Sequence, residues 1–67
     1  MNEVKYHTHF SMVNQGHKLD VFVMTINQKL QVMLYITDGI SGEVNVFTLK
    51  DDNLVDFVQR LGVLNIY

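Results

Sequence analysis

Four short segments with strand-like patterns follow one another through the first 50 residues. Residues 4–13 alternate apolar and polar side chains, which is typical of a strand with one buried face. Residues 18–26, 30–37 and 43–49 are rich in β-branched and aromatic side chains, and turn residues separate them. Because the connections are short, we expect an antiparallel meander in which each strand pairs with the next.

After residue 50 the period of the apolar side chains changes to that of a helix. Four apolar residues recur at helical spacing and would form one stripe, namely Leu54, Phe57, Val58 and Leu61. The sequence therefore predicts an α+β fold for residues 1–67, as a single small domain. A four-stranded antiparallel β-meander is followed by one C-terminal α-helix, which packs on one face of the sheet.

Both ends of the predicted helix carry capping signals, but those at the N-terminal end allow more than one N-cap residue. Thr48 with Asp51 resembles a capping box, whereas Asp51 or Asp52 could cap the helix directly. Gly62 is expected to stop the helix, with Val63 making the hydrophobic contact beyond it.

Loop length decides which side chains share a face of the sheet. A two-residue loop at 27–28 sets Val21 opposite Leu34, and a loop of three or five residues within 38–42 then sets Leu34 opposite Val46. One face becomes almost purely aliphatic, and the helix stripe is predicted to pack on it. This face comprises Leu19, Val21, Val23, Leu30, Val32, Leu34, Ile36, Val44 and Val46.

The first hairpin has two candidate registers. Gly16 fits a three-residue loop with a bulge, which would bring His7 and His9 onto the aliphatic face. An even-numbered loop instead brings Tyr6, Phe10 and Met12 there. Burying an imidazole without a partner costs about 2 kcal/mol or more, so we favour the even-numbered loop.

The face opposite the helix then has an aromatic and methionine centre with a polar border. Since one helix covers one face only, this second face stays open, and open apolar patches of this composition are typical of interfaces. We therefore predict a protein-binding or dimer surface there. Its centre consists of Phe22, Met24, Met33, Tyr35 and Phe47, with His7 and His9 at the edge.

The two histidines have a second interpretation as metal ligands. An H-x-H pair on one strand can supply two zinc ligands, and Asp20 on the next strand could be a third. Many exposed strands carry such a pair, so we interpret His7 and His9 as ordinary polar residues and predict neither a metal site nor a cofactor. At the border of an interface they could make binding pH-dependent.

No group of residues indicates catalysis. Ser11 and Ser41 lack a histidine and carboxylate arrangement that would make either a nucleophile. The three aspartates near the start of the helix suit its positive end. The loop 38–42 contains two glycines but precedes a strand and has no partner lysine, so we expect a hairpin rather than a phosphate site.

Composition limits the partners and the compartment. With a net charge of −2 and only five lysine and arginine residues, the chain lacks a basic stripe, which argues against nucleic-acid binding. The absence of cysteine excludes disulfides and thiolate zinc sites. The N-terminal residues lack the pattern of a secretory signal and the apolar runs are too short for a membrane span, so we expect a cytoplasmic protein without membrane contact.

Size and apolar content favour self-association. A core in a domain of 67 residues supplies about 3–5 kcal/mol, so further support is expected. Apolar residues make up 48% of the chain and charged residues only 18%, which indicates that a partner covers some of the surface. Residues 63–67 are open to two interpretations, a short extra strand or a segment that crosses to a partner.

These observations predict a non-catalytic protein-binding module, an inhibitor or adaptor that acts through its apolar sheet face as a homodimer. Viruses and mobile elements carry many small chains of this kind, which is an argument by analogy. The alternatives are a small-ligand binder with a pocket at the subunit interface, and a purely structural dimerisation module.

Overall fold

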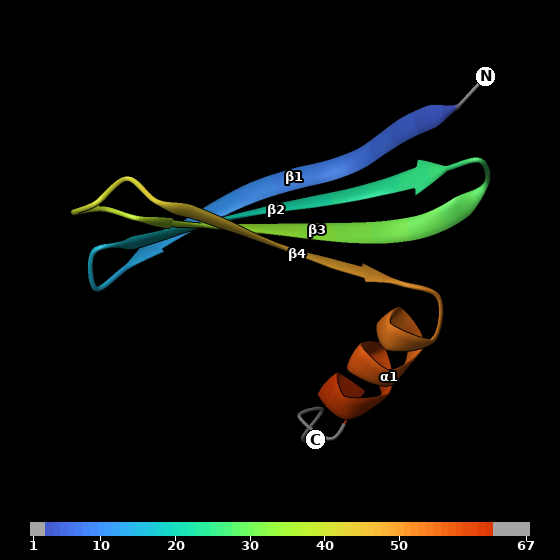
Figure 1. Cartoon of the computed structure of the whole chain (residues 1–67). Coiled ribbons are helices and arrows are strands. Elements are labelled where there is room, and N and C mark those ends of the chain that lie inside the picture. The colour runs from blue at the N-terminus through green and yellow to red at the C-terminus, as the bar shows by residue number, and fades with distance from the viewer. Residues whose placement is uncertain (1–2, 63–67) are drawn as a thin grey trace.

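The computed structural model describes residues 3–62 and confirms the predicted α+β class (Figure 1). The four strands form one antiparallel sheet in the order β1-β2-β3-β4, and the helix follows the last strand. The elements are β1 (Val4–Asn14), β2 (His17–Ile26), β3 (Lys29–Asp38), β4 (Val44–Lys50) and α1 (Asp51–Leu61).

The middle hairpin has the predicted two-residue loop. Asn27 and Gln28 both adopt positive φ values, of 50° and 68°, as the turn that matches the right-handed twist of two strands requires. Val21 consequently lies opposite Leu34, as predicted. The backbone N–H of Asn27 donates to the carbonyl of Glu3, 2.9 Å away, which ties the start of the chain to this turn.

The first hairpin has an even-numbered loop, Gln15–Gly16, also with two positive φ values. Phe10 therefore lies opposite Val21, on the predicted face. A β-bulge at His7, between Tyr6 and Thr8, then adds one residue to β1. Because side chains alternate along a strand, the extra residue reverses the parity of every residue before it.

Because of the bulge, the predicted faces of two side chains, Tyr6 and His7, are wrong. Tyr6 lies opposite Met24 and faces the side of Phe22, not the aliphatic side. His7 Nε2 hydrogen-bonds Thr25 Oγ1, and Thr25 shares the parity of Val21 on the other side of the sheet.

The third hairpin differs from the predicted loop of three or five residues. Residues 39–42 form a four-residue loop, in which the N–H of Asp38 donates to the carbonyl of Glu43 at 2.9 Å and the N–H of Gly42 donates to the carbonyl of Asp38 at 2.8 Å. One Asp38 carboxylate oxygen accepts the N–H groups of Ile40 and Ser41, at 2.8 Å and 3.2 Å. The side chain of Asp38 thus builds the turn.

This loop shifts β4 by one residue relative to the prediction. Leu34 lies opposite Phe47, and Tyr35 lies opposite Val46. Phe47 and Leu49 therefore face the helix, whereas Val46 and the equivalent Val44 face the other side. This corrects the predicted faces of Phe47, Val46 and Val44.

The predicted side-chain N-cap is absent, whereas the helix ends at Leu61 with Gly62 at its C-cap position, as predicted. The N-cap position is Lys50, which has no side-chain capping bond, and Asp51 begins the helix with a φ of 54°. Gly62 adopts the right-handed conformation, with φ −58° and ψ −27°, instead of the left-handed one. The expected contact of Val63 and the tail 63–67 lie outside the described residues.

The helix contacts the sheet on one face, as predicted, but it covers only a corner (Figure 1). It touches β3 and β4 and, among the described residues, neither β1 nor β2. We call the side of the sheet that α1 contacts the helix-side face, and the opposite side the groove face. Buried apolar side chains occur on both, with Val21, Leu49 and the helical Leu54 on the helix side and Met24 on the groove face.

The molecule is correspondingly flat. Its principal extents are 42 × 37 × 18 Å and its radius of gyration is 13.9 Å. A compact domain of this length would have a radius of gyration of about 11 Å. One layer of strands with a helix at its corner therefore encloses little interior.

Candidate functional site

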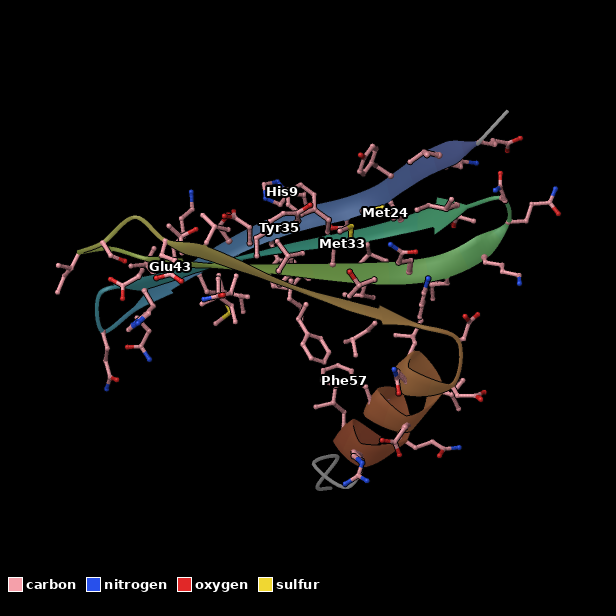
Figure 2. The ribbon with its side chains drawn as sticks, in the orientation of Figure 1. His9, Met24, Met33, Tyr35, Glu43 and Phe57 are labelled. Carbon is pink, nitrogen blue, oxygen red and sulfur yellow. The ribbon has the colours of Figure 1, made fainter. Side chains whose placement is uncertain are left out.

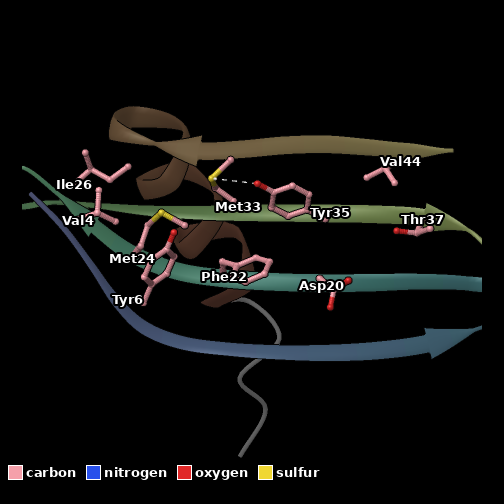
Figure 3. Close-up of a pocket in the computed structure, with 10 residues that line it drawn as sticks. All are labelled: Val4, Tyr6, Asp20, Phe22, Met24, Ile26, Met33, Tyr35, Thr37 and Val44. Carbon is pink, nitrogen blue, oxygen red and sulfur yellow. Dashed lines mark hydrogen bonds between the residues drawn. The ribbon is translucent and has the colours of Figure 1, made fainter. Parts of the chain in front are cut away.

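A groove of about 580 Å³ runs along the groove face (Figure 3). Its lining is mostly apolar, and ten residues from all four strands contribute to it. These are Val4 and Tyr6 of β1, Asp20, Phe22, Met24 and Ile26 of β2, Met33, Tyr35 and Thr37 of β3, and Val44 of β4.

One end of the groove is packed by methionine and tyrosine. Met24 is only 5% exposed, although no helix covers this face. Its cross-strand neighbour Tyr6 lies beside it, and Met33 comes from the next strand (Figure 3). The hydroxyl of Tyr35 points to the sulfur of Met33 at 4.0 Å. Flexible methionine side chains give this end a surface that can adapt to different shapes.

A row of rings crosses the middle of the sheet. The imidazole of His9 stacks on the ring of Phe22, with centroids 4.2 Å apart and planes 3° from parallel. Phe22 in turn meets Tyr35 edge to face, with a centroid distance of 5.4 Å and an angle of 80°. Each such pair stabilises the arrangement by about 0.5–1.5 kcal/mol beyond the burial of area, so the row is a preformed surface.

The other end of the groove carries a carboxylate. Asp20 Oδ1 accepts a hydrogen bond from the Ser11 hydroxyl and lies 3.2 Å from His9 Nε2, while Oδ2 lies 3.8 Å from Lys18 Nζ. The bonds from Ser11 and His9, with the charge of Lys18, lower the pKa of Asp20 below its ordinary value. Asp20 is therefore ionised at neutral pH, and it is the only charged residue among the described residues that line the groove.

The structure brings most of the predicted surface together. Phe22, Met24, Met33 and Tyr35 all line the groove, and His9 borders it through its stacking on Phe22. Phe47 and His7 do not belong to it. The four-residue loop turns Phe47 to the helix side, and the bulge turns His7 toward Thr25.

Sequence reasoning missed Tyr6, Val4 and Val44 as groove residues. Val44 could have been found, because an aspartate followed by four loop residues with a final glycine is a recognisable turn signal. No local signal marks the bulge that turns Tyr6 and Val4 to this face, since residues 4–13 alternate without interruption.

The polar residues at the groove form no familiar catalytic or metal-binding arrangement. Ser11 and His9 both bind the same oxygen of Asp20, so the serine donates its proton to a carboxylate rather than to an imidazole, as a serine nucleophile would need. The bulge separates His7 from His9. Within residues 3–62, no group of three or more histidine, aspartate and glutamate side chains could hold a metal ion.

The sequence matches no family model, and neither the curated proteins nor the solved structures compared with it give a match. In the part of the chain that the structure describes, no helix has both the length and the apolar character needed to cross a membrane.

Proposed function

We propose that this chain is a non-catalytic, cytoplasmic protein-binding module, an inhibitor or adaptor that works as a homodimer. Its groove face holds a segment of another protein. The observation that supports the proposal is the apolar groove itself, which lies on the side of the sheet away from the helix and has aromatic and methionine side chains at its centre. Residues of these types are enriched in the centres of protein interfaces.

The negative charge at one end of the groove indicates which kind of segment would bind there. Asp20 is ionised, and it lies next to an otherwise apolar surface. A segment with several apolar side chains and one lysine or arginine complements this distribution, because the basic group can reach the carboxylate while the apolar side chains cover Phe22, Met24 and Met33. Such charge pairing favours the correct orientation of the bound segment.

The test starts with affinity capture from the native host, followed by binding measurements with the purified partner. Val44→Asp places a second charge in the groove, and we expect it to weaken binding at least about tenfold, or 1.4 kcal/mol. Ile40→Asp is the matched control, since it changes the net charge equally at a fully exposed loop position outside the groove. Equal affinity of wild type and Val44→Asp would contradict the proposal, as would a host lysate that yields no partner.

A small-ligand binder is the second candidate. The volume of about 580 Å³ lies within the range of about 300–1,000 Å³ that is usual for ligand sites, and both Tyr35 and His9 flank the groove. A thermal-shift screen addresses this candidate. A compound that raises the melting temperature of wild type but not of Val44→Asp would favour it over protein binding.

A purely structural dimerisation module is the remaining candidate, in which the groove face is the seam between two copies. It differs from the first proposal in one measurable respect, because a charge in the groove would then dissociate the dimer.

A further inference from the structure

The helix leaves most of its own apolar stripe uncovered. Leu54 is buried, but Phe57, Val58 and Leu61 remain 40%, 58% and 46% exposed. Figure 1 shows the reason, since the axis of α1 leads away from the sheet after the first turn. Phe57 points toward the sheet (Figure 2), and together with Leu34 and Phe47 it lines a cleft of about 380 Å³ between the helix and the sheet.

The helix-side face of the sheet is also largely uncovered, above all on β1, which the helix does not reach within residues 3–62. Phe10 and Met12 of β1, Ile36 of β3 and Phe47 of β4 are all exposed on this side. The helix of the same chain touches neither β1 nor β2 in the described part of the molecule. One side of the chain therefore carries both an apolar helix stripe that the sheet does not cover and an apolar sheet surface that the helix does not cover.

Charges are confined to the ends of this face. On β1 and β2, Lys5 and His7 lie at one end and His17 at the other, and the positions between them are uncharged. No central charge would repel a second copy, and none would select a partner of opposite charge. Homodimer interfaces are more apolar than other interfaces and are depleted of charge at their centres.

The exposed area matches what a stable dimer buries. The accessible surface of the chain is 5692 Å², whereas a compact monomer of 7.8 kDa would expose about 4,400 Å². The excess is about 1,300 Å² for each chain and is shared by the two faces of the flat sheet. Half of it, or about 1,300 Å² for two chains, falls in the range of about 1,200–2,000 Å² for stable protein interfaces. A second copy is therefore the occupant that the size of the uncovered surface fits.

We propose that two copies associate through their helix-side faces about a twofold axis, with α1 of each copy packed on β1 and β2 of the other. The contact is isologous, because the helix stripe of each chain covers the exposed sheet surface of the other. Phe57, Val58 and Leu61 of one copy then cover Phe10 and Met12 of its partner.

This arrangement assigns different roles to the two sides of the sheet. It extends the homodimer part of the proposed function and does not depend on what the groove binds. Both grooves remain open on the outer surfaces of the dimer, so a partner with two binding segments gains from simultaneous attachment to both.

The sharpest test uses neighbouring residues of β4 that face opposite sides. Phe47 on the helix side is 58% exposed and Val46 on the groove face is 51% exposed, so either can receive a charge without displacing a buried side chain. At micromolar concentration, sedimentation velocity should show a dimer for wild type and for Val46→Glu. Phe47→Glu should weaken the dimer by about thirtyfold or more, as the loss of a central interface side chain does.

Two results would overturn the proposal, a monomeric wild type and dissociation caused by Val46→Glu. Circular dichroism shows whether Phe47→Glu is folded. If it is not, Met12→Glu and Val13→Glu form a second matched pair on β1, again with exposed residues on opposite sides, and only Met12→Glu should dissociate the dimer.

Isotope-filtered nuclear Overhauser spectra of a mixed dimer test the helix placement directly. The methyl groups of Val58 and Leu61 in the labelled copy should show contacts with the Phe10 ring of the unlabelled copy. A dimer without these contacts contradicts the arrangement. Since no partner protein takes part, a failure here leaves groove binding intact, and a failure of groove binding leaves the dimer intact.

Discussion

The two sides of the sheet achieve burial by different means. On the groove face, Met24 is buried by its neighbours on adjacent strands, and the ring of Phe22 contacts those of His9 and Tyr35. On the helix side, Phe47 stays more than half exposed although a helix lies nearby. The rings and methionines of the groove face contact one another across neighbouring strands. Phe10, Met12 and Phe47 on the helix side stay exposed because α1 covers only a corner of that side.

The face of the sheet that the helix contacts is therefore not the only face with buried side chains. The groove face is a preformed surface, which suits it for recognising a partner. The helix-side face is an incomplete core, which suits it for permanent contact with another chain. Three predictions test this difference, in order of decreasing effect.

Truncation of Met24 should affect stability as strongly as truncation of a side chain beneath the helix. Met24→Ala and Leu49→Ala both remove equally buried side chains, and each should lower the free energy of unfolding by about 2–4 kcal/mol. Urea unfolding at one protein concentration measures both, since the stability of a dimer depends on concentration. Val46→Ala is the exposed control and should cost less than about 0.5 kcal/mol. A cost for Met24→Ala as small as for this control would mean that the groove face is not packed.

Loss of the Phe22 ring should have an intermediate effect. Phe22→Leu keeps an apolar side chain but removes the contacts with His9 and Tyr35, so we expect a loss of about 1–2 kcal/mol in urea unfolding. Val46→Ala on the same face is the control, because Val46 is half exposed and its side chain carries no ring. A loss for Phe22→Leu as small as for Val46→Ala would mean that the ring contacts do not stabilise the groove face.

Acidification should have the smallest effect on stability. It should protonate Asp20 on the groove face and Asp38 at the third hairpin as two separate events. The Ser11 and His9 bonds lower the pKa of Asp20 from 3.8, and the N–H groups of Ile40 and Ser41 lower that of Asp38. Because both folded pKa values lie below the unfolded ones, each carboxylate stabilises the fold above the unfolded pKa. This contribution is lost as the pH falls through the folded value.

Proton and carbon chemical shifts followed during acidification measure this prediction. Protonation of Asp20 should change the signals of His9 and Phe22 in the groove, whereas protonation of Asp38 should change those of the loop 39–42. Asp20→Asn should abolish the first set of changes and leave the second. Titration of either carboxyl at or above 3.8 would contradict the sign of the shift.

The candidate site was predictable only in part, and the reason is the same for each miss. Phe22, Met24, Met33 and Tyr35 come from two strands joined by a two-residue turn, in which the loop length leaves one register. Phe47 was assigned to the wrong face because the loop after β3 had several possible lengths. A single residue more or less in a loop moves a whole strand from one face to the other.

Local patterns in the sequence are enough to specify the helix and strands of this protein. Alternation, turn residues and the change to helical spacing are local properties, and they specified four strands, their order and the final helix, with bounds within a residue or so of those observed. The predicted antiparallel meander needed no long-range information, because short connections leave few alternatives.

The folded chain is needed to learn which side chains share a face and how much of each face is covered. The bulge at His7 turns Tyr6 into the groove, the Asp38 loop turns Phe47 away from it, and the exit of β4 directs α1 away from β1 and β2. The bulge and the position of α1 depend on contacts between segments that are distant in sequence, such as His7 with Thr25. The Asp38 loop is held by hydrogen bonds within residues 38–43, and its effect on β4 depends on its length. Local periodicity carries no information about such contacts, so the functional surface became visible only in three dimensions.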